Sequence, residues 1–275
     1  MALGVSEEHL ELAASVRGWA ERHCGPGVVR AAAESGGTES GGPESGGTGS
    51  YTDVLRPALA RQGLFGLHLP EESGGQGYGL SELAVALEEL GQALVPGGFL
   101  PTVLTSAVLA AARPGDGGDP GGDIGKLLAG LADGSRSGAV ALAAGLTGTA
   151  TDGGLILDGE SSPVLAGSLA DLLVLPVLSG TQERWAVVDA GDLIVTGLDS
   201  LDRTRPLATL RADRAPVPAG RILPGLSRTD DTGLAAAPGS WDRGTPWDPR
   251  TPRDQGARTL LAHTLLAHIG PARSC

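Results

Sequence analysis

The sequence is poor in the residues that staple small domains or bind metals through sulfur. Its 275 residues include two cysteines and one methionine. Cys24 lies in the first predicted helix, and Cys275 is the last residue. This placement excludes a disulfide framework and a thiolate metal cluster, and it fits a reducing compartment. We therefore expect a cytoplasmic protein without a metal site.

Positive charge and long apolar runs are also scarce. Twenty Lys and Arg residues stand against 32 Asp and Glu residues, which gives a formal net charge of −12. An acidic chain repels phosphate backbones, so nucleic acid is not an expected partner. No window reaches the ~18 apolar residues of a membrane span. The acidic N-terminus also lacks the basic start and apolar centre of a signal peptide.

The first half of the chain has the patterns of helices. Ser6 is a suitable N-cap for the first helix, which Gly25-Pro26 ends. An internal repeat of the type ESGG[TP] covers residues 34–48 and contains no apolar residue, so we expect a flexible loop there. The further helices are predicted at about 51–62, from a cap at Ser81 to Pro96, at 102–112 and at 124–132. The run 63–70 is predicted to be extended.

The helix that follows Ser81 has a clear apolar side. Its apolar stripe is predicted to consist of Leu83, Ala84, Leu87, Leu90 and Leu94. The acidic residues between them, Glu82, Glu88 and Glu89, are predicted to face water. An amphipathic helix of this kind belongs on the surface of a bundle.

From about Gly134 onward, short apolar runs alternate with turn signals. Asp152-Gly153-Gly154 and Asp158-Gly159 are candidate hairpin turns. Regularly spaced strands favour an antiparallel barrel or sandwich. The fold class is therefore α+β: a helical bundle (1–134), a small antiparallel β-barrel or sandwich (135–225), and an irregular tail (226–275). The predicted strands cover 139–144, 155–159, 163–167, 171–177, 185–190, 193–197 and 206–213.

A cluster of glycines precedes the helix at Ser81, as in loops that bind phosphate. Gly75, Gly77 and Gly79 are spaced G-x-G-x-G, however, and no lysine follows to neutralise a phosphate. We interpret the cluster as a tight entry turn in which glycines supply positive φ.

Taken whole, residues 63–96 resemble the N-terminal helical domain of the acyl-CoA dehydrogenase family. Residues 154–177 resemble that family's strand pair G-x-x-L-x-G-x-K-x-[FWY]-I-[ST]-N-x-x-x-A-D, and residues 215–225 resemble its exit from the β domain, V-P-x-x-x-x-L-x-G. The resemblance covers about residues 6–225. In the helical domain the matching positions are Gly63, Pro70, Glu71, Gly74, Gly75, Gly77 and Glu88 to Gly91.

This resemblance implies an FAD-dependent enzyme that oxidises an acyl-CoA thioester to the trans-2-enoyl-CoA. In the family a glutamate takes the α proton while a β hydride passes to the flavin, and hydrogen bonds polarise the thioester carbonyl. The flavin lies between the β domain and a C-terminal four-helix domain. The acyl chain runs against the N-terminal helices.

The resemblance also marks the cofactor-binding positions, which are Leu142 and Ala143 in one segment and Pro163, Val164 and Leu165 in another. The family's T-E-P is replaced by Ala143 and the two residues after it, and [FWY]-I-[ST] is replaced by Pro163-Val164-Leu165. The aromatic ring that would pack on the flavin and the hydroxyl that would bond to it are absent.

Residues 256–273 resemble the start of the first helix of the family's C-terminal domain, and the sequence ends inside that helix. We therefore expect that domain to be missing and the chain to be truncated. The family's catalytic glutamate comes from the same domain, so no catalytic residue is predicted here.

Two functions follow from the resemblance. The chain is either part of an FAD-dependent acyl-CoA dehydrogenase, or a non-catalytic subunit or degenerate fragment that associates with an active paralogue. A homo- or hetero-oligomer with an acyl-CoA dehydrogenase subunit is expected in either case. The replaced flavin positions favour the second function, because truncation alone would not have changed Ala143 or Pro163.

Overall fold

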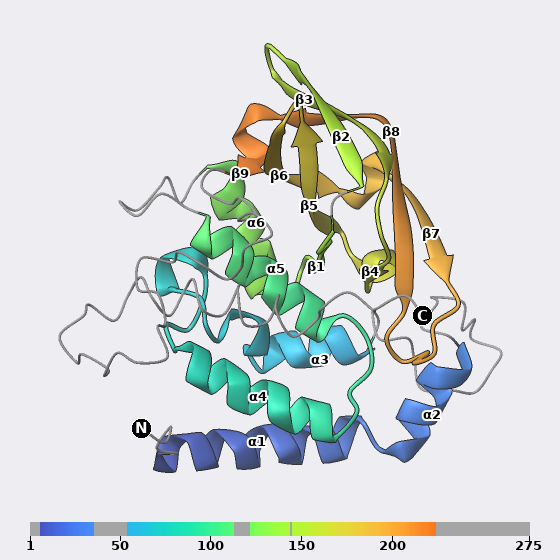
Figure 1. Cartoon of the computed structure of the whole chain (residues 1–275). Helices are drawn as coiled ribbons and strands as arrows, with labels where there is room; N and C mark the ends of the chain where they lie inside the picture. Colours follow the sequence, from blue (N-terminus) through green and yellow to red (C-terminus); the bar gives the residue numbers. More distant parts are fainter. Residues whose placement is uncertain (1–5, 36–53, 113–121, 144, 224–275) are drawn as a thin grey trace, which may run out of the picture.

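The structure is a computed structural model that describes residues 6–35, 54–112, 122–143 and 145–223. Figure 1 shows the helices in one half of the molecule and the sheet in the other. The repeat at 34–48, apart from its first two residues, and the predicted tail lie outside the described residues. The division of the chain into 1–134, 135–225 and 226–275 stays a prediction.

The helical half confirms most of the predicted helices. Ser6 caps the first helix, because its side chain accepts a hydrogen bond from the His9 backbone N–H. The unpredicted helix begins at Pro26, where a proline needs no backbone donor and its fixed φ suits a first turn. Pro101 similarly sits within the first turn of its helix, so that helix begins at Phe99 rather than at 102. The helices are α1 (Glu7–His23), α2 (Pro26–Ser35), α3 (Arg56–Arg61), α4 (Leu80–Gln92), α5 (Phe99–Ala111) and α6 (Asp123–Ala132).

The run 63–70 was predicted to be extended, and this is wrong. Gly63 adopts a φ of 69°, and Leu64–Gly66 form a 3₁₀ turn. Every residue of that turn is buried. The Phe65 ring is tilted by 53° to the Phe99 ring, and the ring centroids are 5.1 Å apart. A short, mostly apolar run predicts that the segment is buried, but its pattern does not distinguish a strand from a buried turn.

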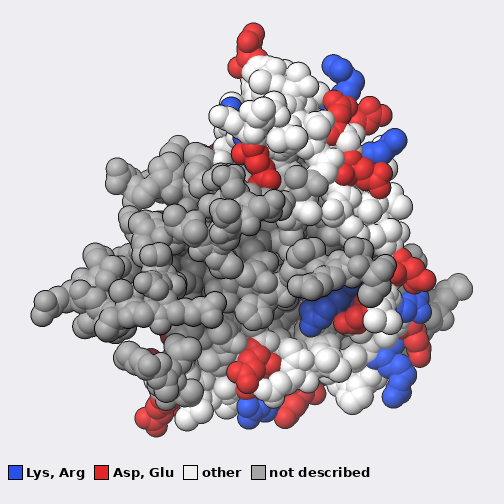
Figure 2. All heavy atoms as spheres, viewed as in Figure 1, with Lys and Arg blue, Asp and Glu red and all other residues white. Residues whose placement is uncertain are grey.

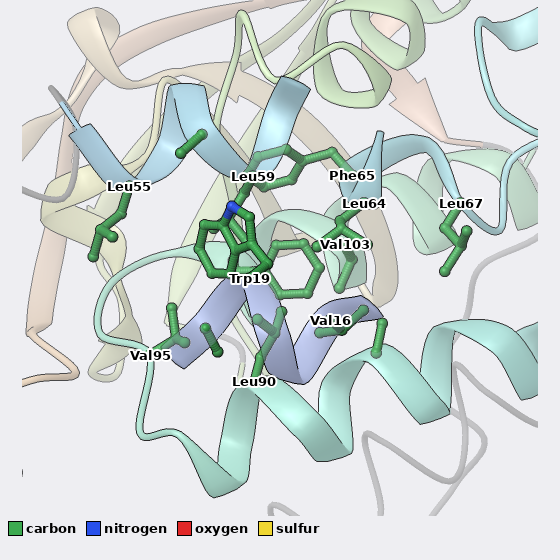
Figure 3. Packing of buried hydrophobic residues seen from close by; sticks show 14 of the residues in the cluster. Val16, Trp19, Leu55, Leu59, Leu64, Phe65, Leu67, Leu90, Val95 and Val103 are labelled. Atoms are coloured by element: carbon green, nitrogen blue, oxygen red, sulfur yellow. The ribbon is translucent and has the colours of Figure 1, made fainter. Parts of the chain in front are cut away.

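These rings lie in the core of the helical half, which joins α1, α3, α4 and α5 (Figure 3). Trp19 and Leu59 face one another across this core with 2% and 0% of their surface exposed. Aliphatic residues fill the rest, as the low aromatic content leads one to expect. The core residues labelled in Figure 3 are Val16, Trp19, Leu55, Leu59, Leu64, Phe65, Leu67, Leu90, Val95 and Val103.

The glycine cluster before α4 is the entry turn that the sequence predicts. Gly74 and Gly77 have φ values of 79° and 72°. The amides of Gln76, Gly77 and Tyr78 donate to the carbonyls of Gly66, Leu69 and Leu67, so the loop's N–H groups are used within the protein and do not form a phosphate cradle.

The start of α4 differs slightly from the prediction. Its N-cap is Gly79 rather than Ser81, because the Glu82 carboxylate reaches back and accepts from the Gly79 N–H at 2.8 Å. That contact satisfies one of the free donors at the helix end. Of the predicted apolar stripe, Ala84 is exposed, and Leu94 lies beyond the helix with 59% of its surface exposed.

The prediction that Glu89 faces water is wrong. Only 6% of Glu89 is exposed, and its carboxylate accepts hydrogen bonds from the guanidinium of Arg17. His9 on α1 similarly contacts Glu82 on α4 at 3.0 Å. The two contacts show that α1 and α4 run parallel, side by side (Figure 1). Arg17 lies on the side of α1 that meets α4, so the Glu89 carboxylate is buried against its guanidinium.

The strands of the described chain form one mixed sheet with the order β4-β8-β3-β2-β5-β6-β9. The predicted antiparallel pairing holds for most neighbours, but β1 and β2 both run parallel to β5. β7 is paired with β8 at the side of this path. The strands are β1 (Gly138–Val140), β2 (Leu146–Thr151), β3 (Gly154–Glu160), β4 (Val164–Leu165), β5 (Leu172–Ser179), β6 (Gln182–Asp189), β7 (Ile194–Leu198), β8 (Leu207–Pro218) and β9 (Ile222–Leu223).

Strand β2 was not predicted, because glycine occupies one of its two buried positions. A Cβ on Gly148 would lie 2.8 Å from a methyl group of Val177, so the strand packs closely without an apolar side chain there. The hairpin turn at Asp152-Gly153 is confirmed. The second candidate turn is wrong: Asp158-Gly159 lies at a bulge within β3, where Gly159 adopts a φ of 112°.

The two halves share a core. Leu128 and Leu131 of α6 pack with Leu172 and Val174 of β5, and all four are fully buried. α5 packs against β1. The Thr102 hydroxyl of α5 accepts a hydrogen bond from the Gly138 N–H of β1 at 3.2 Å, which fixes the start of the strand. Among the described residues, no helix is both long and apolar enough to cross a bilayer.

Candidate cofactor site

The structure brings the two predicted cofactor-binding segments to neighbouring positions, because β1 and β4 are in contact. Leu142 and Ala143 lie two and three residues beyond the end of β1 and are half-buried. In the second segment Pro163 is exposed, Val164 is buried, and Leu165 is half-buried. Segments about twenty residues apart in sequence therefore meet near the boundary between helices and sheet.

The first segment lies where the chain leaves the sheet. β1 pairs with β5 up to Val140, and the Ala141 N–H donates to the Val174 carbonyl at 2.9 Å. Pairing with β5 resumes at Leu146 in β2. Gly145 is held against the end of β3, since a Cβ there would lie 2.2 Å from the Glu160 carbonyl. β1 and β2 therefore pair with successive parts of β5, and the link between them is the point at which this pairing is interrupted.

The second segment ends in a sharp turn. Ala166 has a φ of 54°, and its N–H donates to the Pro206 carbonyl at 2.7 Å. The family pattern has asparagine at this position. Asparagine tolerates the left-handed region better than alanine does, so the backbone supplies a physical reason for that residue type. In this chain alanine adopts the left-handed conformation at the position where the family pattern has asparagine.

A carboxylate fixes β1 to its surroundings. Asp171 Oδ2 accepts hydrogen bonds from the Ser137 N–H at 2.7 Å and from its hydroxyl at 2.8 Å. The same oxygen accepts from Arg56 of α3 at 3.2 Å. This node joins the start of β1, the start of β5 and the helical half. The sequence analysis did not predict a role for Asp171. The signal available for it was the A-D pair that ends the family's strand pattern, which is Ala170-Asp171 in this chain.

A second polar node joins the halves further along. The Arg221 guanidinium bridges Asp123, at 2.7 Å, and Asp189, while Arg136 donates to the other oxygen of Asp189 at 3.0 Å. Burial alone raises the pKa of Asp189, but the hydrogen bonds and charges of Arg221 and Arg136 outweigh it and hold that pKa below its usual value. The carboxylate therefore stays ionised and keeps α6 tied to the sheet.

A histidine is enclosed between the entry turn and α5. His68 Nε2 lies 3.2 Å from the Ser106 hydroxyl, which also donates to the Val103 carbonyl at 3.0 Å. Burial lowers the pKa of His68 to about 4, so the ring is neutral at pH 7. Its Nδ1 is buried and has no hydrogen-bond partner among the described residues. Because Ser106 is only 1% exposed, this pair does not offer an accessible nucleophile.

The donor set of the candidate site does not fit the flavin as the family holds it. The side chains of Leu142, Ala143, Pro163, Val164 and Leu165 carry no hydrogen-bonding group. A bound flavin has a polar ring edge whose buried groups need partners. From these five positions only backbone groups are available. No group of three His, Cys, Asp or Glu residues within the described ranges is arranged to hold a metal.

Comparison with known proteins identifies relatives of this chain in sequence and in fold. Residues 6–115 match the family model described as acyl-CoA dehydrogenase, N-terminal domain. The acyl-CoA dehydrogenase IpdE2 of Mycobacterium tuberculosis is 33% identical over 209 residues, which are 75% of this chain and 52% of that protein. Acyl-CoA dehydrogenase FadE34 of the same organism is 27% identical over 100% of this chain and 36% of its own length. The chain thus spans about half the length of the curated relatives it matches.

Solved structures agree in fold. The Tcur3481–Tcur3483 steroid ACAD variant has a TM-score of 0.64 and 28% identity, covering 79% of this chain and 57% of that one. The ChsE4–ChsE5 complex from Mycobacterium tuberculosis has a TM-score of 0.66 over 81% of this chain and 58% of that one, and at 23% identity it shows the fold alone. Helices followed by a small β domain were predicted from the sequence, and this order is confirmed. The sheet is mixed, whereas an antiparallel barrel or sandwich was expected. Residues 6–115 are an acyl-CoA dehydrogenase N-terminal domain, and together with the sheet domain that follows them they resemble proteins of the acyl-CoA dehydrogenase family.

Proposed function

We propose that this chain is a non-catalytic subunit of an acyl-CoA dehydrogenase assembly, in which a partner subunit holds the flavin for α,β-dehydrogenation of an acyl-CoA thioester. One observation carries this proposal: all five side chains at the positions where the family contacts FAD lack hydrogen-bonding groups. The backbone of the site is well defined, with a left-handed turn at Ala166 and hydrogen bonds from Ser137 to Asp171. The chain therefore combines the fold of the family with positions that lack the family's side-chain contacts to the cofactor.

The relatives support an assembly of unlike chains. One solved relative is described as a complex of ChsE4 with ChsE5, and another carries the joint name Tcur3481–Tcur3483. In such a pair, a chain that has the family fold without the side-chain contacts to flavin would be the subunit that does not hold the cofactor. The proposal includes an acyl-CoA as the substrate of the whole assembly.

The second candidate is that the chain is itself an FAD-dependent dehydrogenase. The relatives with bound FAD or FADH2 have the same fold, with TM-scores of 0.64 and 0.63. In this alternative, backbone groups of the β1–β2 link and of β4 would replace the missing side-chain contacts.

Titration of the purified full chain with FAD separates the two candidates. Flavin fluorescence and the visible absorption spectrum are recorded after gel filtration, and circular dichroism verifies folding. The proposal predicts a chain that elutes without flavin. Co-elution of one flavin per chain would overturn it and support the dehydrogenase instead.

A gain-of-contact variant provides the matched comparison. Pro163→Trp combined with Leu165→Thr restores an aromatic ring and a hydroxyl at the family positions, and we expect it to bind FAD at least tenfold more tightly than the wild-type chain, a difference of about 1.4 kcal/mol. Ser162→Thr, which adds a methyl group at the neighbouring exposed position, serves as control. Equal and tight FAD binding by wild type, variant and control would contradict the proposal.

A further inference from the structure

A pocket at the C-terminal ends of α1 and α4 lies outside the candidate cofactor site and has no role in the function proposed above. Its volume is about 690 Å³, within the range of pockets that bind small molecules. α2 forms the third wall, and Figure 1 shows this helix beside the ends of α1 and α4, at the lower right of the view. We call it the three-helix pocket, whose lining residues lie within 17–33 and 89–94.

The helices turn regular faces toward the three-helix pocket. The lining residues of α1 and its C-cap begin at Arg17 and end at Cys24, with the spacing i, i+3, i+4 and i+7. Those of α2 have the same spacing and run from Pro26 to Ala33. Positions three and four apart lie on one side of a helix. The shape of the pocket is therefore set by the packing of helices and not by one loop.

The floor of the three-helix pocket carries small side chains. Ala20 is 1% exposed and Cys24 is 5% exposed. Burial raises the pKa of the Cys24 thiol, so this part of the floor is uncharged at pH 7. Every residue of α2 is half-buried or exposed, and Val29 and Ala33 place apolar surface along the wall. Small floor residues and an uncovered apolar wall leave space for an apolar ligand.

A strained residue stands at the edge of the three-helix pocket. Leu94 has a φ of 52°, in a conformation that glycine usually supplies after a helix. Backbone hydrogen bonds from Leu94 to Gly91 and from Val95 to Leu90, both 3.0 Å, hold the turn in place. The Leu94 side chain lines the pocket although it is 59% exposed. Residues in unfavourable backbone conformations cluster at ligand sites, and here the strain holds an apolar side chain where a ligand would cover it.

The charges around the three-helix pocket balance. The Glu89 carboxylate is neutralised by the Arg17 guanidinium through hydrogen bonds of 2.9 Å and 2.6 Å. Glu21 of α1 and Arg30 of α2 add one exposed charge of each sign. Figure 2 shows positive and negative side chains close together around α2, at the lower right of the view. An anionic ligand would meet the two carboxylates and a cationic ligand the two guanidiniums, so the balance favours a neutral ligand.

The three-helix pocket also offers a backbone acceptor. The Ala93 carbonyl lies at the C-terminus of α4, where the last carbonyls have no partner within the helix. Its contact among the described residues is the Cys24 thiol, a weak donor, at 4.0 Å. A hydroxyl group both donates and accepts, so it can serve this carbonyl and a guanidinium N–H at the rim.

From these observations we infer that the three-helix pocket binds a neutral apolar molecule that carries a hydroxyl group, such as an aliphatic alcohol. The small floor residues, Val29 and Leu94 contact its apolar body, and the Ala93 carbonyl accepts a hydrogen bond from its hydroxyl. The inference is independent of the proposed function, because none of the lining residues belongs to the candidate cofactor site.

The test uses the full-length chain and three compounds of equal carbon number, namely decanol, decanoate and decylammonium. Isothermal titration calorimetry below their critical micelle concentrations measures the affinities. Decanol should show saturable binding of one molecule per chain. Decanoate and decylammonium should bind at least about tenfold more weakly, because each brings a charge next to a group of the same sign.

Two substitutions locate the binding. Ala33→Trp fills the three-helix pocket and should abolish decanol binding, whereas Glu34→Trp at the next, exposed position should leave the affinity within about twofold. Leu94→Gly should weaken decanol binding at least about threefold while it raises the melting temperature. A more stable chain that binds less tightly does not owe its weaker binding to poor folding.

Charge variants test the preference for a neutral ligand. Glu21→Gln leaves an excess positive charge at the rim and should raise the affinity for decanoate relative to decanol at least about threefold. Arg30→Gln should raise the affinity for decylammonium relative to decanol in the same way. Glu7→Gln removes a charge from the other end of α1 and should leave both ratios within about twofold.

Equal affinity for decanol and for either charged analogue would overturn the inference, and so would an absence of saturable decanol binding. Unchanged binding by the Ala33→Trp variant would place the alcohol elsewhere and refute the assignment. Sedimentation of the wild-type chain covers another occupant: self-association that Ala33→Trp abolishes would assign the three-helix pocket to a second copy and refute a small ligand.

Discussion

The Glu89 carboxylate on α4 accepts two hydrogen bonds from the Arg17 guanidinium on α1, at 2.9 Å and 2.6 Å, and the two partners differ greatly in exposure. Glu89 is almost fully buried, whereas 56% of the Arg17 side chain is exposed. Removing Arg17 leaves a buried carboxylate without its partner, while removing Glu89 leaves a cation that water can reach. We therefore expect that the loss of Arg17 lowers the stability more than the loss of Glu89.

Arg17→Met should lower the melting temperature more than Glu89→Met does. In the double variant the loss should be smaller than the sum of the single losses, because no unpaired charge remains in it. Thermal unfolding followed by circular dichroism measures all four proteins. A larger loss for Glu89→Met than for Arg17→Met would refute the assignment of the buried partner.

Leu94→Gly should stabilise the protein by about 1 kcal/mol. Leu94 follows the C-cap of α4 and adopts the left-handed conformation, with a φ of 52°, which glycine adopts more easily. Its side chain is 59% exposed, so little packing is lost. Leu94→Ala keeps the unfavourable backbone conformation and removes only the side chain, so it serves as the control and should change little. Urea unfolding gives both values. Equal effects of the two substitutions would show that the side chain, and not the backbone, determines the result.

The two glycines Gly75 and Gly91 should respond in opposite directions to substitution by alanine. A Cβ on Gly75 would lie 2.1 Å from the Leu69 carbonyl oxygen, so Gly75→Ala should cost more than about 2 kcal/mol. Gly91 has no atom within 4 Å of that position and lies in α4, so Gly91→Ala should stabilise by about 0.5–1 kcal/mol. Urea unfolding measures both, and a tolerated Gly75→Ala would contradict the packing of the entry turn.

His68 should make stability depend on pH. Its pKa is lowered from 6.5 to about 4 by burial, so between these values the unfolded state binds more protons than the folded state. The free energy of unfolding should therefore rise with pH across this window, by up to about 3 kcal/mol in total, and remain level in this respect above it. His68→Gln should remove this rise. Urea unfolding at several pH values between 4 and 7.5 tests it, and parallel profiles for wild type and variant would refute it.

Asp171→Ala should destabilise the junction between the halves by about 1–2 kcal/mol, since three donors lose their charged acceptor. Arg56→Gln removes only the contact to α3 and should cost less. Both are measured by urea unfolding. If the two variants are equally unstable, the bonds from Ser137 contribute nothing beyond the ion pair.

The sequence predicted the elements whose pattern is strong and local. Ser6 has the polar side chain of an N-cap, and Asp152-Gly153 is a hairpin signal; both lie where expected. Prediction was poorer where distant residues decide. Nothing near Glu89 indicates that Arg17, 72 residues away, removes it from water.

Two other misses have a similar cause. Gly148 occupies a core position of β2 without an apolar side chain, so the strand has no visible alternation. The parallel pairing of β1 with β5 depends on contacts across more than 30 residues, which the spacing of apolar runs does not encode. For the candidate cofactor site, the resemblance located two segments that the fold brings together. The node at Asp171 was missed because its three residues, Arg56, Ser137 and Asp171, come from separate parts of the chain.

The pairing of both β1 and β2 with β5 has a consequence for the order of folding. β2 and β3 are joined by a two-residue turn and close a short loop, whereas β1 must wait until β5, more than 30 residues later, is in place. Closing the longer loop costs more entropy, so β1 should join the sheet after the hairpin has formed. Because β1 also receives α5, the helical half would become attached to the sheet in the same late step. In pulse-labelling hydrogen exchange during refolding, the amides of β2 and β3 should gain protection before that of Ala141, and simultaneous protection would contradict this order.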